Sequence, residues 1–111
     1  MNDLLIVFTT LPDLNAAEEL ARRIVEARLA ACVQVLPAMT SVYLWQGDVQ
    51  REAEHLLLIK TSAASYPRLE EFITENHSYS VPEIVAVQAD KVSAAYLSWL
   101  KSSLDTSEAP N

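Results

Sequence analysis

The sequence predicts an α+β fold in which two helices cover one face of an antiparallel sheet. Strand-like and helix-like segments follow in the order strand, helix, strand, strand, helix, strand, with one further helix at the end. The two longest strand-like segments flank Gly47, the only glycine among the 111 residues. Because glycine adopts positive φ at little cost, a lone glycine between strand formers predicts a hairpin turn.

Length and composition limit the classes of protein that this chain can represent. A chain of this length forms one domain and buries a core without staples, and the single Cys32 excludes an internal disulfide or a multi-thiolate metal site. The net charge of −7 argues against a nucleic-acid or anionic membrane partner, because both require a basic face. No basic leader precedes the first apolar run, and no run approaches the ~20 residues that span a bilayer. We therefore expect a soluble, cytoplasmic protein.

The first two elements are a strand and an amphipathic helix. Residues 4–10 form a compact apolar run that ends before Pro12, which is typical of a buried strand. Asp13 or Asn15 is the expected N-cap of a helix over residues 16–28. Its apolar residues recur at helical spacing and form one stripe: Ala17, Leu20, Ala21, Ile24 and Val25.

The central segment predicts a long hairpin. Residues 29–35 enter a second strand, which Pro37 interrupts with a bulge or an edge. The strand resumes at Ser41, turns at Gly47 and returns over residues 49–61. The returning strand would span roughly 40 Å at about 3.3 Å per residue, whereas a domain of this size has a radius of gyration of about 13 Å. Such an arm should protrude, and we expect a second copy of the chain to receive it.

The second helix begins near Ser65 and Pro67 and ends near residues 76–77. Its inner stripe consists of Leu69, Phe72 and Ile73.

The last predicted elements are a strand over residues 83–87 and a short helix capped by Ser93. The tail, residues 105–111, has little to bury and is expected to be frayed and disordered. Four residues are expected to share one face of the helix: Tyr96, Trp99, Leu100 and Leu104.

With right-handed crossovers, this order of elements closes into a ferredoxin-like α+β sandwich. One face of its sheet remains without helices. Residues 42–45 and 84–87 of its strands are nevertheless apolar at successive positions, whereas a solvated face would place a polar residue at every second position. Surplus apolar surface of this kind marks an interface, so the sequence predicts a homo-oligomer.

Six short motifs occur along the chain, and together they resemble one family. They are Thr10-Leu11-Pro12, Arg28-Leu29-Ala30-Ala31-Cys32, Ser41-x-Tyr43-x-Trp45-x-Gly47, Glu54 with Ile59-Lys60-Thr61, His77-x-Tyr79-x-x-Pro82-Glu83, and Tyr96-Leu97-x-Trp99. In this order and spacing, they make the chain similar to the CutA family of divalent-cation-tolerance proteins. The resemblance covers nearly the whole of a single domain, residues 1–104.

The resemblance implies a ferredoxin-like fold and a tight homotrimer in which the long hairpins pair between subunits. It also implies kinship of architecture with the PII signalling proteins. The family is associated with tolerance of copper and other divalent cations, and some members bind copper. No enzymatic reaction is established for it, so the resemblance implies a protein that is not an enzyme and requires no cofactor.

Two positions depart from the ligand set of metal-binding relatives. Some bacterial members carry a cysteine where this chain has Thr9, and a His-His pair where it has Asn76 and His77. Of that set, His77 alone is present. The resemblance therefore assigns a metal-binding role to His77 without its usual companions.

The segment around His77 is the first candidate site. His77, Tyr79 and Glu83 lie within seven residues, and Lys60 ends the long strand that could reach them. One interpretation is a polar pocket at a subunit boundary, with Lys60 and Tyr79 lining a cleft and the imidazole and carboxylate holding a cation. In the other interpretation His77 caps the helix, Glu83 pairs with Lys60, and Tyr79 anchors a loop.

Cys32 is the other candidate metal ligand. Within Ala-Ala-Cys-Val it is typical of a small buried apolar residue. Its alternative role as a soft ligand for Cu(I) needs a second donor, for which Met39 is the near candidate. His55 is expected at the surface.

Aromatic and acidic residues of the hairpin have simpler interpretations. The spacing of Tyr43, Trp45 and Trp99 favours core and subunit packing over a ligand-stacking box. Glu52 and Glu54 share a strand face that is expected to be solvated, and the alternative for this face is a weak, unspecific divalent-cation site.

Two functional hypotheses follow. The first is a trimeric, non-enzymatic protein of metal-ion response that binds copper or another divalent cation weakly. The second is a PII-like signalling or scaffold trimer that binds a small molecule or a protein at its subunit clefts. An enzyme is the least supported reading, because the sequence contains no nucleophile–base motif and one glycine cannot build a phosphate loop.

Overall fold

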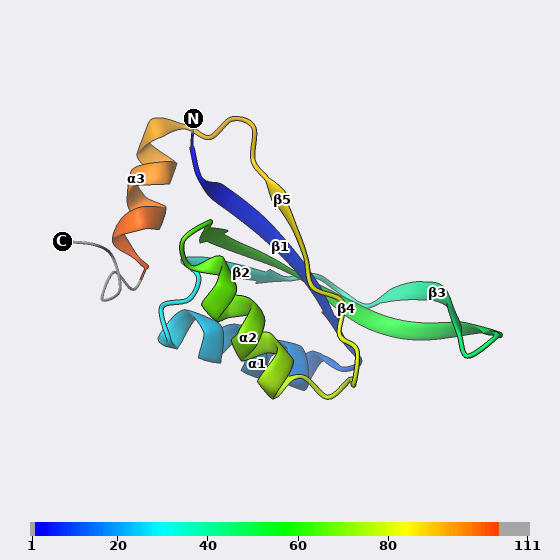
Figure 1. The fold of residues 1–111 in the computed structure, drawn as a ribbon. Coiled ribbons are helices and arrows are strands. Elements are labelled where there is room, and N and C mark those ends of the chain that lie inside the picture. The colour runs from blue at the N-terminus through cyan, green and yellow to red at the C-terminus, as the bar shows by residue number, and fades with distance from the viewer. Residues whose placement is uncertain (1, 105–111) are drawn as a thin grey trace.

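Five strands and three helices follow one another in the computed structural model, which describes residues 2–104 (Figure 1). The expected disorder of residues 105–111 lies outside the described residues. The elements are β1 (Leu4–Leu11), α1 (Leu14–Glu26), β2 (Cys32–Val35), β3 (Met39–Trp45), β4 (Asp48–Ser62), α2 (Tyr66–Asn76), β5 (Val85–Gln88) and α3 (Ala94–Ser102). The predicted order is confirmed, and the break that Pro37 predicts separates β2 from β3.

The sheet has the strand order β2-β4-β1-β5, with every neighbouring pair antiparallel. This is the ferredoxin-like arrangement that the sequence predicts. β4 is long enough, at 15 residues, to pair with β1 and β2 along one half and with β3 along the other. The β3–β4 half leaves the sheet as a two-stranded arm (Figure 1), and the molecule measures 49 × 27 × 24 Å.

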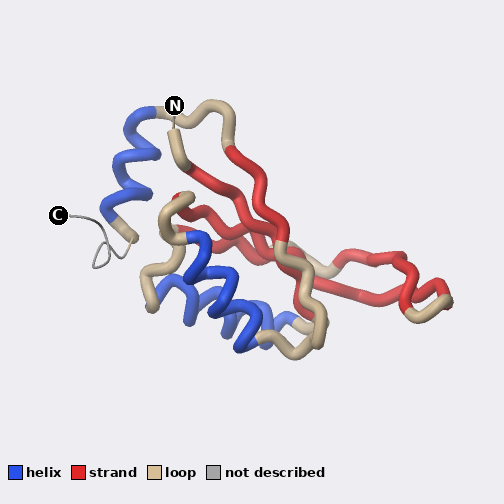
Figure 2. The backbone as a smooth tube through the Cα atoms, in the orientation of Figure 1, coloured by secondary structure: helices blue, strands red, loops and turns tan. Residues whose placement is uncertain are grey.

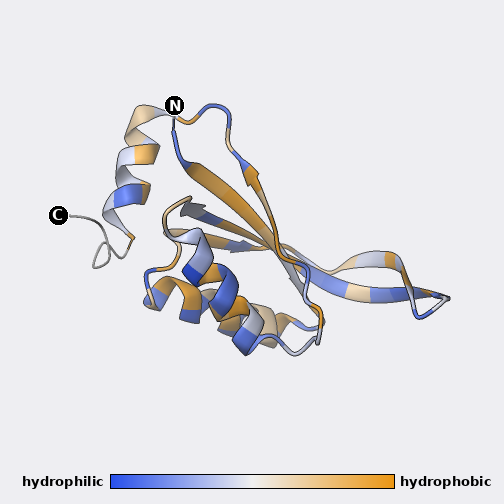
Figure 3. Cartoon of the chain, in the orientation of Figure 1, coloured by the Kyte–Doolittle hydropathy of each residue, from blue (hydrophilic) through white to orange (hydrophobic). Residues whose placement is uncertain are grey.

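The helices α1 and α2 lie side by side on one face of the sheet (Figure 2). Alternate residues of a strand point to opposite faces, so Val7 and Leu11 of β1 join this helix-covered core while Leu4 points the other way. On the opposite face, α3 covers the end where Leu4 packs with Leu100 and Leu104. Figure 3 shows apolar residues concentrated along β1, and apolar and polar residues interspersed along the helices.

The helix ends follow from local capping. Asp13, not Asn15, is the N-cap of α1, because its Oδ1 accepts the amide of Ala16 at 2.8 Å. α1 ends at Glu26, two residues before the predicted end, and Arg28 adopts a φ of 59°. α2 ends at Asn76, as predicted.

The expected face of α3 is only partly right. Ser93 caps the helix, and its Oγ accepts the amide of Tyr96. Leu100 and Leu104 are buried, but Tyr96 and Trp99 are 36% and 48% exposed. Their ring centroids lie 5.5 Å apart, and Tyr96 also neighbours Cys32 of β2. Helical spacing alone could not distinguish the buried pair, Leu100 and Leu104, from the exposed pair, Tyr96 and Trp99, because the helix is short and apolar on more than one side.

The hairpin turn forms where Gly47 predicts it. Trp45 pairs with Asp48, and the two residues between them have positive φ, 50° for Gln46 and 85° for Gly47. Two left-handed residues define the tight turn that suits the twist of a hairpin. The turn fixes the register of the whole arm, so that Met39 faces Glu54 at its base.

Candidate functional site: an acid-lined cavity at the base of the hairpin

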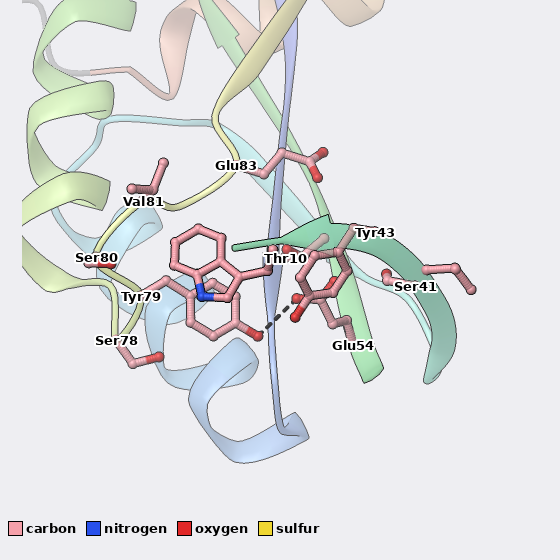
Figure 4. Close-up of a pocket in the computed structure, with 11 residues that line it drawn as sticks. Thr10, Ser41, Tyr43, Glu54, Ser78, Tyr79, Ser80, Val81 and Glu83 are labelled. Atoms are coloured by element: carbon pink, nitrogen blue, oxygen red, sulfur yellow. Dashed lines mark hydrogen bonds between the residues drawn. The ribbon is translucent and has the colours of Figure 1, made fainter. Parts of the chain in front are cut away.

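A cavity of about 650 Å³ lies where the arm leaves the sheet. We call it the hairpin-base cavity. Its walls come from the hairpin, from the end of β1, and from the segment between α2 and β5 (Figure 4). The lining residues are Thr10, Ser41, Val42, Tyr43, Trp45, Glu54, Ser78, Tyr79, Ser80, Val81 and Glu83.

Glu54 and Tyr79 connect two walls of the hairpin-base cavity. The Tyr79 hydroxyl donates to Oε2 of Glu54 across 2.8 Å (Figure 4). Burial raises the pKa of Tyr79 well above its usual range, and the neighbouring Glu54 carboxylate raises it further. Tyr79 therefore keeps its proton and acts as a hydrogen-bond donor to the carboxylate.

The expectation that Glu54 is solvated is wrong, because only 7% of the residue is exposed. Glu52, two positions before it on the same face, is exposed as expected. The difference arises because the segment carrying Tyr79 crosses the arm at Glu54. Strand alternation identifies the face of a residue, but it does not reveal which distant segment covers that face.

His77 supports the cavity wall from behind. Its Nε2 lies 2.7 Å from the carbonyl oxygen of Thr10, and its Nδ1 accepts the backbone N–H of Tyr79 at 3.0 Å. These partners assign a neutral ring with the proton on Nε2. His77 occupies the C-cap position of α2, but its ring bonds to β1 and not to the carbonyls of the helix.

Glu83 and Tyr79 both line the hairpin-base cavity, whereas Lys60 does not. The expected pairing of Glu83 with Lys60 is wrong, because the Lys60 ammonium donates to Oε1 of Gln34 at 2.5 Å. Six positions of β4 separate Lys60 from the buried Glu54, a distance of roughly 20 Å at about 3.3 Å per residue. Lys60 therefore belongs to the other end of the sheet.

Cys32 also lies at that distant end, paired in register with Lys60. It is half-buried and neighbours Tyr96, whose pKa is raised by burial and then by the thiol. Within residues 2–104, no group of three or more His, Cys, Asp or Glu side chains could hold a metal ion. The structure therefore does not bring His77, Glu83 and Cys32 together in one chain.

The two positions that depart from metal-binding relatives do not supply replacement donors. Thr9 is fully buried on the helix-covered side, together with Val7 and Leu11. The Asn76 side chain accepts from Arg23 and donates to the carbonyl of Phe72, both at 2.8 Å. Because the Asn76 side chain and both His77 nitrogens are engaged, and Thr9 is buried on the helix-covered side, this set does not fit a metal ion.

His55 departs from its expected place at the surface. It is half-buried, and its Nδ1 lies 2.9 Å from the carbonyl oxygen of Leu36.

The chemistry of the hairpin-base cavity is acidic and aromatic. Its described lining contains two carboxylates, Glu54 and Glu83, and no lysine, arginine, histidine or cysteine. Tyr43, Trp45 and Tyr79 add aromatic surface, and hydroxyl groups add neutral oxygens. Such a lining suits a cation and disfavours an anion such as phosphate.

Sequence reasoning identified Tyr43, Trp45, Tyr79 and Glu83 but assigned the hairpin aromatics to packing alone. For Glu54, the sequence offers only a weak and unspecific divalent-cation site on a solvated face, and it does not predict the cavity that covers this residue. The available signal was register, because a two-residue turn at Gly47 places Glu54 at the base of the arm.

A four-stranded ferredoxin-like sheet, covered on one face by two helices and extended by a projecting hairpin, places this chain among the α+β proteins. The family model described as "CutA1 divalent ion tolerance protein" matches residues 5–103. This chain belongs to that family.

Individual relatives agree. The divalent-cation tolerance protein CutA of Thermus thermophilus is 44% identical over 96 residues, covering 86% of this chain and 93% of the relative. The chloroplastic protein CutA of Arabidopsis thaliana is 43% identical over 89% of this chain, but this chain spans only 54% of it. The crystal structure of CutA1 from Oryza sativa superposes with a TM-score of 0.92 at 40% identity, covering 96% of this chain and 97% of that one.

No helix within residues 2–104 is long and apolar enough to cross a membrane.

Proposed function

We propose that this chain is the subunit of a non-catalytic homotrimer that binds divalent cations, in keeping with the tolerance family to which it belongs. The observation that supports cation binding is the lining of the hairpin-base cavity. It includes the carboxylates of Glu54 and Glu83, and its described residues include no lysine, arginine or histidine. Oxygen donors of this kind suit hard ions such as Mn²⁺ and Mg²⁺ better than soft Cu(I). Two carboxylates per chain supply few ligands, so the proposed binding is weak.

The proposed trimer accounts for apolar surface that a single chain leaves in water. Val42, Leu44 and Val49 of the arm are 66%, 69% and 74% exposed. Val85 and Val87, on the sheet face that α3 leaves open, are also exposed. A second copy that covers these strands would remove an apolar patch and a free hairpin edge together.

Light scattering tests the assembly. The proposal expects a mass of about three times 12.3 kDa at micromolar concentration, and a lower mass for Leu44→Asp. A monomer of the unmodified chain would overturn the proposal. Glu75→Gln, a change on the exposed side of α2, serves as the control.

Calorimetric titration with Mn²⁺, Mg²⁺ and Cu²⁺ tests the cation site. The proposal expects Glu54→Gln and Glu83→Gln to weaken Mn²⁺ binding, while Glu52→Gln, an equal change of charge outside the lining, leaves it unchanged. Binding that depends on His77 or Cys32 and not on the two glutamates would contradict the proposed ligands. Absence of any bound cation would contradict the function itself.

A second candidate function is a PII-like scaffold that binds a small molecule at its subunit clefts. The volume of the hairpin-base cavity favours it, because about 650 Å³ falls within the range of roughly 300–1,000 Å³ typical of small-molecule sites. A thermal-shift screen of small molecules separates the two functions, since a ligand of the native state raises the melting temperature.

A further inference from the structure

We infer that the hairpin-base cavity is a binding site for small quaternary ammonium ions, with Glu54 as the counter-charge and aromatic side chains as the walls. This inference rests on the proposal that the cavity binds a cation, and it names an organic class of cation for the same site.

The Glu54 carboxylate, which is the proposed counter-charge, is buried and has few partners. Glu54 is more than nine-tenths buried and lines the cavity, and its one hydrogen-bond partner among residues 2–104 is the Tyr79 hydroxyl. No lysine, arginine or histidine within those residues forms an ion pair with it. Burying a carboxylate without a cation is unfavourable, so the site gains most from a ligand that brings a positive charge.

The walls are suited to an organic cation. Tyr43, Trp45 and Tyr79 all line the cavity, and Figure 4 shows the Tyr43 and Tyr79 rings on either side of the Glu54 carboxylate. The negative faces of aromatic rings attract ammonium groups, and alkyl groups on the nitrogen add apolar contact with the rings and with Val81. The wall of the cavity carries a negative electrostatic potential. Burial raises the pKa of Tyr43, and the negative charges of Glu52 and Glu54 raise it further.

The same features select against a bare metal ion as the best ligand. No three metal-ligating side chains of residues 2–104 converge, so a divalent ion would keep most of its water. A cavity of about 650 Å³ with three aromatic side chains offers that hydrated ion little. A quaternary ammonium ion uses the volume, the rings and the carboxylate together.

The two tryptophans allow a direct test. Trp45 lines the cavity, whereas Trp99 lies on α3 at the other end of the sheet. In the Trp99→Phe protein, Trp45 is the sole tryptophan, and its fluorescence reports on the cavity. In the Trp45→Phe protein, Trp99 provides the matched reporter of nonspecific effects. Both proteins are titrated at constant ionic strength in their native assembly.

The probes are choline, ethanolamine and the neutral carbon isostere of choline. We expect choline to change the fluorescence of Trp45 saturably and that of Trp99 not at all. Loss of the charge or of the methyl groups should weaken binding about tenfold, because each removes one of the two attractions. Equal binding of choline and its neutral isostere, or of choline and ethanolamine, would overturn the inference.

Variants separate the charge from the rings. Glu54→Gln should weaken choline binding about tenfold, while Glu75→Gln, an equal change of charge on the exposed side of α2, leaves it within twofold. Tyr43→Leu should weaken choline but leave Mn²⁺ binding unchanged, since Tyr43 is already 40% exposed and contributes a ring face. Circular dichroism melting verifies that each variant is folded, and choline binding that survives both Glu54→Gln and Tyr43→Leu would overturn the site.

A Mn²⁺ titration distinguishes this inference from the proposed function. Mn²⁺ binding without choline binding would overturn the quaternary ammonium site and leave metal binding standing. Choline binding without Mn²⁺ binding would support the site and overturn the metal ligands. Competition between the two would support both at one place.

Discussion

The Tyr79 hydroxyl donates to the Glu54 carboxylate across 2.8 Å, although 25 positions separate the two residues in the chain. This bond fastens the segment before β5 to the base of the hairpin. It also orients a buried carboxylate toward the hairpin-base cavity. The hydrogen bond is therefore a structural link and a component of the candidate site at once.

Tyr79→Phe should lower the free energy of unfolding by about 2 kcal/mol, because it leaves a buried carboxylate oxygen without its donor. Chemical denaturation at fixed protein concentration measures the change. Tyr66→Phe is the matched control, since the Tyr66 hydroxyl donates to Glu70 at 2.7 Å in an exposed helical pair. That loss should cost less than about 0.5 kcal/mol. Equal losses in the two variants would show that burial of Glu54 does not strengthen its bond.

The tyrosines should titrate late in the folded protein. Burial is the largest cause that raises the pKa in each of the four tyrosines, Tyr43, Tyr66, Tyr79 and Tyr96. Tyrosinate absorbance should therefore rise at higher pH in the native protein than in denaturant. An unchanged titration curve would contradict the environment that the structure assigns to Tyr79, the tyrosine with the largest shift.

The raised pKa of Tyr79 also predicts how the stability of the fold changes at alkaline pH. The folded state holds the Tyr79 proton more tightly than the unfolded chain, whose tyrosines titrate near about pH 10. The stabilisation is fully present below that pH and is lost as pH rises toward the folded pKa. Tyr79→Phe should make the alkaline fall in stability shallower, as followed by melting temperature against pH. Tyr66→Phe, with its smaller shift, should alter the slope less.

The site illustrates what a sequence pattern can predict. The spacing of His77, Tyr79 and Glu83 predicts a polar pocket, and two of these residues, Tyr79 and Glu83, line the cavity. Glu54 was misread as solvated, because its cover is a segment far along the chain. Lys60 was misplaced for a related reason: sequence order indicates its strand but not the register, which pairs it with Cys32 and lets its side chain reach Gln34.

His77→Ala should loosen the segment that carries Tyr79. The His77 ring accepts the Tyr79 amide at 3.0 Å and bonds to the carbonyl of Thr10 at 2.7 Å, so its removal frees both. Hydrogen exchange should show the Tyr79 amide exchanging about tenfold faster, equivalent to about 1.4 kcal/mol of lost protection.

His55→Ala is the control, because that ring contacts Leu36 and not this segment. An unaltered exchange rate at Tyr79 in the His77 variant would contradict the assigned tautomer and its bonds.

The fold was easier to predict than the site, because its signals are local. Pro37 divides the second predicted strand, and Ser93 caps α3 through its own side chain. Helix faces were less certain where local signals are weak. Trp99 points outward although its spacing allowed burial, and only the packing of Leu100 against β1 decides between the two faces.

Gly47 provides a final test, because its backbone conformation disfavours a side chain whereas its surroundings leave room for one. Its φ of 85° is disfavoured for residues with a Cβ, yet nothing lies within 4 Å of the position that a Cβ would occupy. The cost of a substitution is therefore backbone strain alone. Gly47→Val should destabilise the hairpin by about 1–2 kcal/mol, and Gly47→Asn by less, since asparagine tolerates the left-handed region. Denaturation curves for the two variants, compared at one concentration, measure the difference, and equal losses would show that the turn relaxes out of its left-handed geometry.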